Sequence, residues 1–324
     1  MRGAFLLGAI VAVAASSSAY ADPGQCTAHK RFAVVVHGGE LSQRFDDNGR
    51  LAVMKDALTT ARAALANGAS SIDVVEAIVS TFEDSGLFNS GKGAIANKDG
   101  MVETDASIMD GNGLRAGAVA SMTGIKNPVR AARLVMDKSP HVLMVGDRGE
   151  AFVKSIGAES APPGYFRNNT HPYAGNEEHG TVGAVALDRC GHIAAATSTG
   201  GYDAKIPGRV GDSPIVGAGV YADDNVAGFS ATGHGEYFIR FSIAKDVADR
   251  MRYGHQAMVN SMASDLEVML AQYKDGDGAL IGIDAQGNVV TMWNSVGLFR
   301  GFATDREAPV VAEYQGPSAS APRR

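Results

Sequence analysis

Small and apolar residues form a run that begins abruptly on Thr181, directly after the polar, turn-rich segment 157–180. The run is TVGAVALD (181–188), and a similar one, HIAAATSTGG (192–201), follows after the turn Arg189-Cys190-Gly191. Short apolar runs bounded by turn residues are typical of buried strands. The pair therefore predicts two neighbouring strands in a core. A strand needs no hydroxyl at its first position, which makes Thr181 a candidate for chemistry.

The rest of the chain alternates between strand-like and helical segments. A buried strand is expected at 31–40, ending in a glycine turn, and Ser70 with Asp73 forms a capping box at the start of a helix. Further strands are expected at 101–111, 114–122, 141–146, 213–224, 226–235 and 279–295, and helices at 51–69, 70–86, 129–138, 148–156, 236–252 and 256–273. This order predicts a layered α+β domain in which helices cover the outer faces of sheets.

The composition is that of an ordinary globular chain, with 45% hydrophobic and 20% charged residues among 324. Lysine and arginine total 29 against 35 for aspartate and glutamate, and no long basic run occurs. This charge pattern argues against a nucleic-acid partner.

The N-terminus has the features of a secretory signal peptide. One arginine precedes an apolar stretch, and Ala19-Tyr20-Ala21 then provides an A-x-A cleavage site. We therefore expect residues 1–21 to be removed, and the mature protein to be periplasmic or secreted. A membrane anchor is the alternative, but the apolar stretch is shorter than the roughly 20 residues that a spanning helix needs.

Hydroxyls and glycines concentrate at the predicted strand ends of the second half, at 197–201 and 231–235 as well as at Thr181. Glycine lets backbone N–H groups approach a ligand closely, as an oxyanion hole requires. Arg209 and Asp212 stand between these segments. Such a pair could hold the α-carboxylate and the α-ammonium of an amino acid, or it could be a surface salt bridge.

Long ordered motifs in both halves resemble the plant-type asparaginase / isoaspartyl peptidase family of N-terminal-nucleophile hydrolases. The second half has HGTVGAVALD, GHIAAATSTGG, PGRVGDSPIVGAGVYADD and SATGHGEYFIR, and the first half has VHGG, LFNSGKGA, ETDASIMDG and IKNPVRAA. The likeness runs from about residue 32 to 303. It implies a four-layer αββα sandwich, self-cleavage between Gly180 and Thr181, and hydrolysis of β-aspartyl peptides and L-asparagine.

The same resemblance implies how the mature protein is organised. An α subunit would span 22–180, with 157–180 as a flexible loop before the cut, and a β subunit would span 181–324, with a disordered tail at 316–324. An (αβ)₂ homodimer is implied, with a small-molecule or dipeptide substrate and no organic cofactor.

Roles follow from the resemblance residue by residue. Thr181, freed as an N-terminus, is the nucleophile, because its own α-amine titrates near neutral pH and can take the hydroxyl proton. Thr199 hydrogen-bonds the nucleophile, and Thr232 with the N–H of Gly233 forms the oxyanion hole. The substrate is bound by Arg209, Asp212, Gly235 and Asn89. A structural sodium ion is expected in loop 82–92, on main-chain carbonyls of Phe82, Glu83, Ser85, Phe88, Ser90 and Lys92.

One departure and two alternatives accompany this interpretation. After His37-Gly38-Gly39 the family usually continues with Ala-Gly, whereas this chain has Glu40-Leu41-Ser42, which affects the local turn and the substrate rim. His37 itself is expected to be a structural hydrogen-bonding residue.

Parts of 221–235 also resemble the glycosylasparaginases, which cleave sugar-linked asparagine, although His-Gly-Thr at the cut fits the isoaspartyl branch better. A non-catalytic periplasmic amino-acid-binding protein is the other alternative, but it would have no use for Gly-Thr at a strand start.

Cys26 and Cys190 are the only cysteines, and an exported chain favours a disulfide between them. In the family arrangement, the ends of strands 32–37 and 181–188 that lie away from the active site meet at one edge, near both cysteines. We therefore predict a disulfide that joins the two subunits. A free thiol at each position is the alternative.

Overall fold

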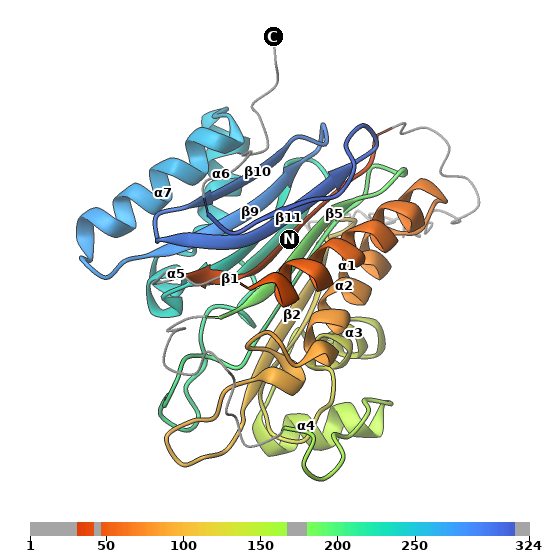
Figure 1. The fold of residues 1–324 in the computed structure, drawn as a ribbon, viewed down its shortest axis with the longest axis vertical. Coiled ribbons are helices and arrows are strands. Elements are labelled where there is room, and N and C mark those ends of the chain that lie inside the picture. Colours follow the sequence, from red (N-terminus) through yellow and green to blue (C-terminus); the bar gives the residue numbers. More distant parts are fainter. Residues whose placement is uncertain (1–30, 42–46, 167–179, 315–324) are drawn as a thin grey trace, which may run out of the picture.

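Two β-sheets lie face to face in the computed structural model, which describes residues 31–41, 47–166 and 180–314 (Figure 1). The larger sheet has eight strands, in the spatial order β12 (Val310–Ala312), β11 (Gly297–Thr304), β1 (Ala33–Leu41), β5 (Val182–Leu187), β6 (Ile193–Thr199), β2 (Thr104–Asp110), β3 (Arg115–Met122) and β4 (Leu143–Val145). The smaller sheet has four, β10 (Val289–Trp293), β9 (Gly278–Asp284), β8 (Ala227–Gly233) and β7 (Val220–Asp223).

Helices cover the outer face of each sheet. The eight-stranded sheet carries α1 (Asn48–Ala66), α2 (Ser71–Ser85), α3 (Pro128–Lys138) and α4 (Gly146–Ser155), and the four-stranded sheet carries α6 (Ile243–Gly254) and α7 (Met258–Gln272) (Figure 1). The short α5 (Gly235–Phe241) follows β8, and a 3-10 turn, η2 (Gly91–Gly93), follows α2. The four layers are those of the αββα sandwich that the resemblance of the motifs implies.

Alternation along the strands divides the core into layers. In β1, Val34 and Val36 belong to the cluster formed with α1 and α2, whereas Ala33 and Val35 belong to the cluster formed with the smaller sheet. In β8 the even-numbered positions face the larger sheet, since a Cβ on Gly228 would lie 2.6 Å from Cγ2 of Ile193 in β6. Residue parity therefore decides which side chains can meet between the sheets.

The first strand differs from its prediction. β1 does not end in a turn at the glycines but continues to Leu41, with an irregular register between His37 and Glu40. Gly39 has a φ of 104°, which favours glycine, so the chain absorbs the irregularity as a bulge and stays in the sheet. Ser42 lies outside the described residues.

The second half also differs in detail. The single helix predicted at 236–252 is two helices, α5 and α6, because Ser242 between them has a left-handed backbone with φ 50°. Residues 213–224 are a regular strand only from Val220 to Asp223. The sequence analysis does not predict β11 and β12.

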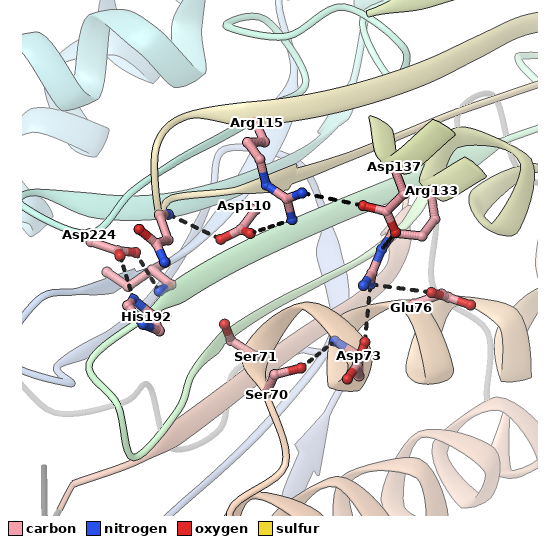
Figure 2. A network of polar contacts seen from close by, with 12 residues as sticks. Ser70, Ser71, Asp73, Glu76, Asp110, Arg115, Arg133, Asp137, His192 and Asp224 are labelled. Atoms are coloured by element: carbon pink, nitrogen blue, oxygen red, sulfur yellow. Dashed lines mark hydrogen bonds and ion pairs between the residues drawn. The ribbon is translucent and has the colours of Figure 1, made fainter. Parts of the chain in front are cut away.

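A network of polar contacts stabilises one end of the sandwich (Figure 2). This is the end at which β5 finishes, opposite to the end that carries Thr181. Arg133 of α3 bonds to three carboxylates, those of Asp137, Asp73 and Glu76, at 2.6, 3.2 and 3.4 Å. Nδ1 of His192 lies 2.7 Å from the carboxylate of Asp224, which joins the turn before β6 to the turn after β7. The turn that contains Cys190 is thus tied to its neighbours.

Cys190 lies between β5 and β6 and is disulfide-bonded. The predicted partner, Cys26, lies outside the described residues, as do the predicted signal peptide 1–21, residues 167–179 of the predicted loop and the tail 316–324. The Cys26–Cys190 pair therefore stays a prediction.

We expect the oxidised protein to contain no free thiol. Denatured without reductant it should take up no iodoacetamide, and after reduction it should take up one label on each of its two cysteines, which mass spectrometry would show. Cys26→Ser and Cys190→Ser should lower the free energy of unfolding equally, by about 2–5 kcal/mol, because each removes the same cross-link. Two labels before reduction would contradict the pair.

Candidate active site

Thr181 lies at the edge of the space between the two sheets, directly before β5. β5 is paired on both sides, with β1 and with β6. The side chain of Thr181 is buried, and its Oγ1 donates a hydrogen bond of 3.0 Å to Oγ1 of Thr199, at the end of β6. The structure thus brings together the first two residues of the predicted catalytic set.

Thr199 is held in place by the turn that follows it. Its Oγ1 accepts from the N–H of Gly201 over 3.0 Å. Asn89 fastens this turn, because its Nδ2 donates to the carbonyl of Gly201 over 2.5 Å while its Oδ1 accepts from the N–H of Ile95 over 3.0 Å. Asn89 was expected to bind substrate, but in this structure both ends of its amide bind the backbone. Asn89 thus holds the turn beside Thr199 in place. A contact between Asn89 and the substrate stays a prediction.

Thr232 and Gly233 stand at the end of the facing strand, β8. Thr232 has the parity of Gly228, so its side chain faces the larger sheet. Its Oγ1 is buried and has no hydrogen-bond partner within the described residues. A buried hydroxyl without a partner is costly, and this one can donate to an oxygen of a bound ligand. Gly233 has φ 142°, and a Cβ there would lie 2.6 Å from the Cα of Gly278.

Arg209 is already engaged by a carboxylate. Its Nε and Nη2 donate to the two oxygens of Glu236, over 2.9 and 2.8 Å, and its guanidinium carbon lies 4.5 Å from the ring centre of Tyr202. Glu236 was not predicted as a site residue, although it directly follows Gly235 in the same motif. A ligand carboxylate must therefore use the remaining edge of the guanidinium, between Nη1 and Nη2, or displace Glu236.

Asp212 is the buried acid of the site. Burial raises its pKa to about 7, against the opposing effect of Arg209. Its Oδ2 has no hydrogen-bond partner among the residues described, which fits a carboxylate that receives an ammonium group from a ligand. A Cβ on Gly235 would lie 2.8 Å from Oδ1 of Asp212 and 3.0 Å from Nη2 of Arg209. Glycine at 235 lets α5 begin directly against this pair.

A buried lysine anchors the loop that carries Arg209 and Asp212. Nζ of Lys205, whose side chain is fully buried, donates to the carbonyl of Glu103 over 2.8 Å. The carboxylate of Glu103 accepts from the N–H of Gly208 over 2.9 Å. Neither residue is predicted from the sequence, because lysine and glutamate are rarely buried and a spacing of 102 residues shows no pattern.

Backbone oxygens crowd together in the loop predicted to hold sodium. The predicted ligands belong to the last turns of α2 and to the turn after it, namely Phe82, Glu83, Ser85, Phe88, Ser90 and Lys92. A Cβ on Gly93 would overlap the carbonyl oxygen of Phe88, and one on Gly91 would lie 2.9 Å from that of Glu83. Hard cations prefer oxygen ligands, and a carbonyl oxygen that accepts one hydrogen bond keeps a second lone pair. Three of the six carbonyls already accept hydrogen bonds, Phe82 from Oγ of Ser85, Phe88 from the N–H of Ser90 and Ser90 from the N–H of Gly93. Ligands of the right kind are therefore present, and the sodium ion stays a prediction.

One small cavity collects most of the predicted site. Its lining consists of Thr181, Thr199, Gly201, Arg209, Asp212, Ser213 and Gly233. A larger groove of about 330 Å³ lies between α1 and α2, but alanines and other apolar side chains make up most of its lining. We assign the active site by chemistry rather than by size, because a hydroxyl pair, an arginine and a buried carboxylate converge on the smaller cavity.

Comparison with known proteins identifies the kind of site. The family described as Asparaginase matches residues 30–172 and 167–313. The chain belongs to the asparaginase family. Its αββα sandwich is accordingly that of an N-terminal-nucleophile hydrolase, as the resemblance of the motifs implies.

Named relatives of this asparaginase-family chain are similar over most of their length. An isoaspartyl peptidase of Salmonella typhimurium is 42% identical over 268 residues, which are 76% of this chain and 85% of the relative. An isoaspartyl peptidase of Escherichia coli is 41% identical over 276 residues, 79% of this chain and 86% of the relative. An isoaspartyl peptidase/L-asparaginase of Rattus norvegicus is 38% identical over 283 residues, 82% of this chain and 84% of the relative.

Proposed function

We propose that this protein is a self-cleaving amidohydrolase that acts on β-aspartyl peptides and L-asparagine through an acyl-enzyme on Thr181. The names of its relatives support the substrate class. One observation carries the proposal. The hydroxyl of Thr181, bonded to Thr199, lies in the same small cavity as Arg209 and Asp212, so a nucleophile and an amino-acid clamp share one space.

Cleavage of the chain is the first step. Oγ1 of Thr181 attacks the carbonyl carbon of Gly180, the C–N bond between the two residues breaks, and the nitrogen takes a proton to become a free α-amine. Water then hydrolyses the ester left between Gly180 and Oγ1. Gly39 packs against this bond, since a Cβ on Gly39 would lie 3.1 Å from the Cα of Gly180. The attack therefore has room that larger side chains would fill.

The new α-amine is the base in turnover. Its unperturbed pKa of about 7.7–8.0 leaves a useful fraction neutral at physiological pH. It takes the proton of Oγ1, which attacks the side-chain carbonyl of the β-linked aspartate. Thr232 Oγ1 and the N–H of Gly233 would stabilise the oxyanion. The C–N bond then breaks as the leaving amine takes the proton, and water hydrolyses the ester to release aspartate.

The clamp would orient the substrate for this attack. Its α-ammonium would bind the unpaired oxygen of Asp212, and its α-carboxylate the open edge of Arg209. Glu236 holds the adjacent edge of the guanidinium, through Nε and Nη2, so the arginine is positioned before the substrate arrives. Prepositioned groups of this kind lower the entropy cost of reaching the reactive geometry.

The two alternatives have less support. A glycosylasparaginase would bind the same aspartyl part of its substrate, but the named relatives above are isoaspartyl peptidases. A binding protein without catalysis would need the clamp but not the bonded pair of Thr181 and Thr199, nor the unpaired hydroxyl of Thr232.

We extend the proposal to the mature protein. It would be exported after loss of residues 1–21 and would consist of an α subunit (22–180) and a β subunit (181–324) that assemble as an (αβ)₂ homodimer. None of the described helices is both long and apolar enough to cross a membrane. A sodium ion in loop 82–92 would stiffen the segment that carries Asn89, and through it the turn beside Thr199.

Thr181→Ala should remain a single chain without hydrolytic activity, because cleavage and turnover use the same hydroxyl, whereas Thr181→Ser should keep part of both. Denaturing gels with N-terminal sequencing would show a smaller wild-type band beginning Thr-Val-Gly-Ala. Cleavage that persists in Thr181→Ala would exclude the mechanism. Faster hydrolysis of a sugar-linked asparagine than of β-aspartyl-leucine would favour the glycosylasparaginase branch.

Asp212 should make ligand binding depend on pH. Because burial raises its pKa to about 7, the carboxyl is mostly protonated below pH 7 in the free enzyme and must lose that proton to pair with an ammonium group. The inhibition constant of L-aspartate, measured against a β-aspartyl dipeptide, should therefore rise about tenfold from pH 8 to pH 6. Asp212→Asn should bind more weakly and show no such rise. A constant that is flat in the wild type would contradict the assignment.

Arg209→Ala should raise KM for β-aspartyl dipeptides while chain cleavage stays intact, because the clamp touches only the free substrate. Loss of a charged hydrogen bond costs about 1.5–3 kcal/mol, so the increase should be about 10- to 150-fold. Glu236→Gln, which keeps the shape but removes the charge, should raise KM by less. Normal turnover by Arg209→Ala would show that the substrate is held elsewhere.

A further inference from the structure

Three buried side chains behind Thr181 form a chain of hydrogen bonds between the two sheets. Nδ1 of His37 lies 3.0 Å from the carbonyl oxygen of Thr181, and Nε2 lies 2.8 Å from Oγ of Ser230. Oγ of Ser230 in turn lies 2.8 Å from Oγ1 of Thr197. His37, Ser230 and Thr197 belong to β1, β8 and β6 and have no exposed surface, so the chain crosses from one sheet to the other and returns.

The directions of the two bonds of the His37 ring follow from its first partner and from the charge of the ring. A carbonyl oxygen can only accept, so Nδ1 of His37 carries a proton and donates to Thr181. Burial lowers the pKa of His37 to about 3, which makes the ring neutral and Nε2 an acceptor. The hydroxyl of Ser230 must then donate to Nε2. The single hydroxyl proton of Thr197 faces two acceptors, Oγ of Ser230 at 2.8 Å and the carbonyl oxygen of Gly219 at 3.2 Å. One tautomer of His37 and one orientation of the Ser230 hydroxyl satisfy both bonds of the ring.

The packing around these groups excludes larger side chains. A Cβ on Gly183, which stands opposite His37 in the ladder, would overlap both Oγ of Ser230 and Nε2 of His37. The ladder between β1 and β5 ends at this pair, and β1 becomes irregular after His37. The carbonyl of Thr181 thus accepts from a side chain at the point where strand pairing with β1 stops.

We propose that His37 is a positioning residue for Thr181, oriented by Ser230 and Thr197, and that its Nδ1–H fixes the main chain of the nucleophile. The proposal rests on the function given above, in which Thr181 reacts through Oγ1 and through its own amine. It assigns no proton transfer to His37, since the ring donates to a carbonyl that takes no part in the chemistry.

The bond matters most once the chain is cut. Thr181 is then held from one side only, and the bond to its carbonyl restricts rotation of the last peptide unit. That restriction sets where the Cα presents the amine and Oγ1 to the substrate. A displacement of about 1 Å can cost about 100-fold in rate. A neutral ring also places no positive charge beside an amine that must be neutral to act as a base.

Two substitutions of His37 separate this role from simple packing. The amide nitrogen of asparagine can take the place of the donor Nδ1, and the amide oxygen of glutamine can take the place of the acceptor Nε2. His37→Asn can therefore keep the bond to Thr181 and lose Ser230, whereas His37→Gln can keep Ser230 and lose Thr181. We expect kcat for β-aspartyl-leucine to fall by at most about tenfold in His37→Asn and by about 100-fold in His37→Gln. KM should stay within about twofold in both, because neither touches Arg209 or Asp212.

A packing role predicts the opposite order, since glutamine is closer to histidine in volume and should give the more stable protein. Thermal unfolding would be measured beside kcat, with rates expressed per cleaved enzyme. If a variant cleaves too slowly for this, the time course of self-cleavage is compared, and His37→Asn should again be faster. A kcat or cleavage rate in His37→Gln equal to or above that in His37→Asn would overturn the proposal.

Ser230→Ala tests the second link. It leaves Nε2 without a donor, so the ring is less firmly oriented and kcat should fall about three- to tenfold with KM unchanged. Ser261→Ala, at a buried serine of α7 whose hydroxyl donates to the carbonyl of Ala257 at the start of that helix, is the matched control and should keep the wild-type kcat. Wild-type kcat in Ser230→Ala would contradict the chain of bonds. A wild-type protein that neither cleaves nor hydrolyses would instead overturn the proposed function.

Discussion

The position of β5 between β1 and β6 is the constraint on which the rest of the site depends. The two registers place Gly183 opposite both His37 and Thr197, which aligns Thr181 with Thr199 two residues further along. A shift of one residue in either register would turn the hydroxyl of Thr181 toward the helices instead of the facing sheet. The alternation of apolar residues that buries the strands therefore also determines that the hydroxyl of Thr181 faces the smaller sheet.

In and around the cavity the cations have hydrogen-bond partners, whereas some of the oxygen atoms do not. Arg209 is matched by Glu236, and Lys205 by the carbonyl of Glu103, so both cations have partners before any ligand binds. Asp212 and Thr232 each keep an oxygen without a partner in the described part of the chain. Leaving polar atoms unpaired in a core costs stability. A zwitterionic substrate would satisfy the unpaired oxygen of Asp212 in this cavity, and an oxyanion would satisfy that of Thr232 beside the lining residue Gly233. The hydroxyl of Ser213, which also lines the cavity, is a third unpaired group.

The sequence predicts a layered α+β domain from alternation and glycine-bounded strand ends, which are local signals, and its resemblance to the family predicts the four layers and most of the candidate site. It does not predict what depends on distant pairing. Glu236 meets Arg209 across 27 residues, and Lys205 meets Glu103 across 102, and neither spacing is a pattern. The same limit explains Asn89, since a motif places the residue near the site but cannot tell whether its amide faces a ligand or the backbone.

The fold also explains how a chain can be cut beside its nucleophile without coming apart. Strands from before and after Gly180–Thr181 interleave in the eight-stranded sheet, where β5 and β6 lie between β1 and β2. Each half therefore completes the hydrogen-bond ladders of the other. The bond that breaks precedes the first residue of β5, so cleavage removes no ladder pair. What cleavage does remove is the covalent restraint on Thr181 itself, and the contacts of its carbonyl with His37 and of its hydroxyl with Thr199 replace that restraint from the intact side.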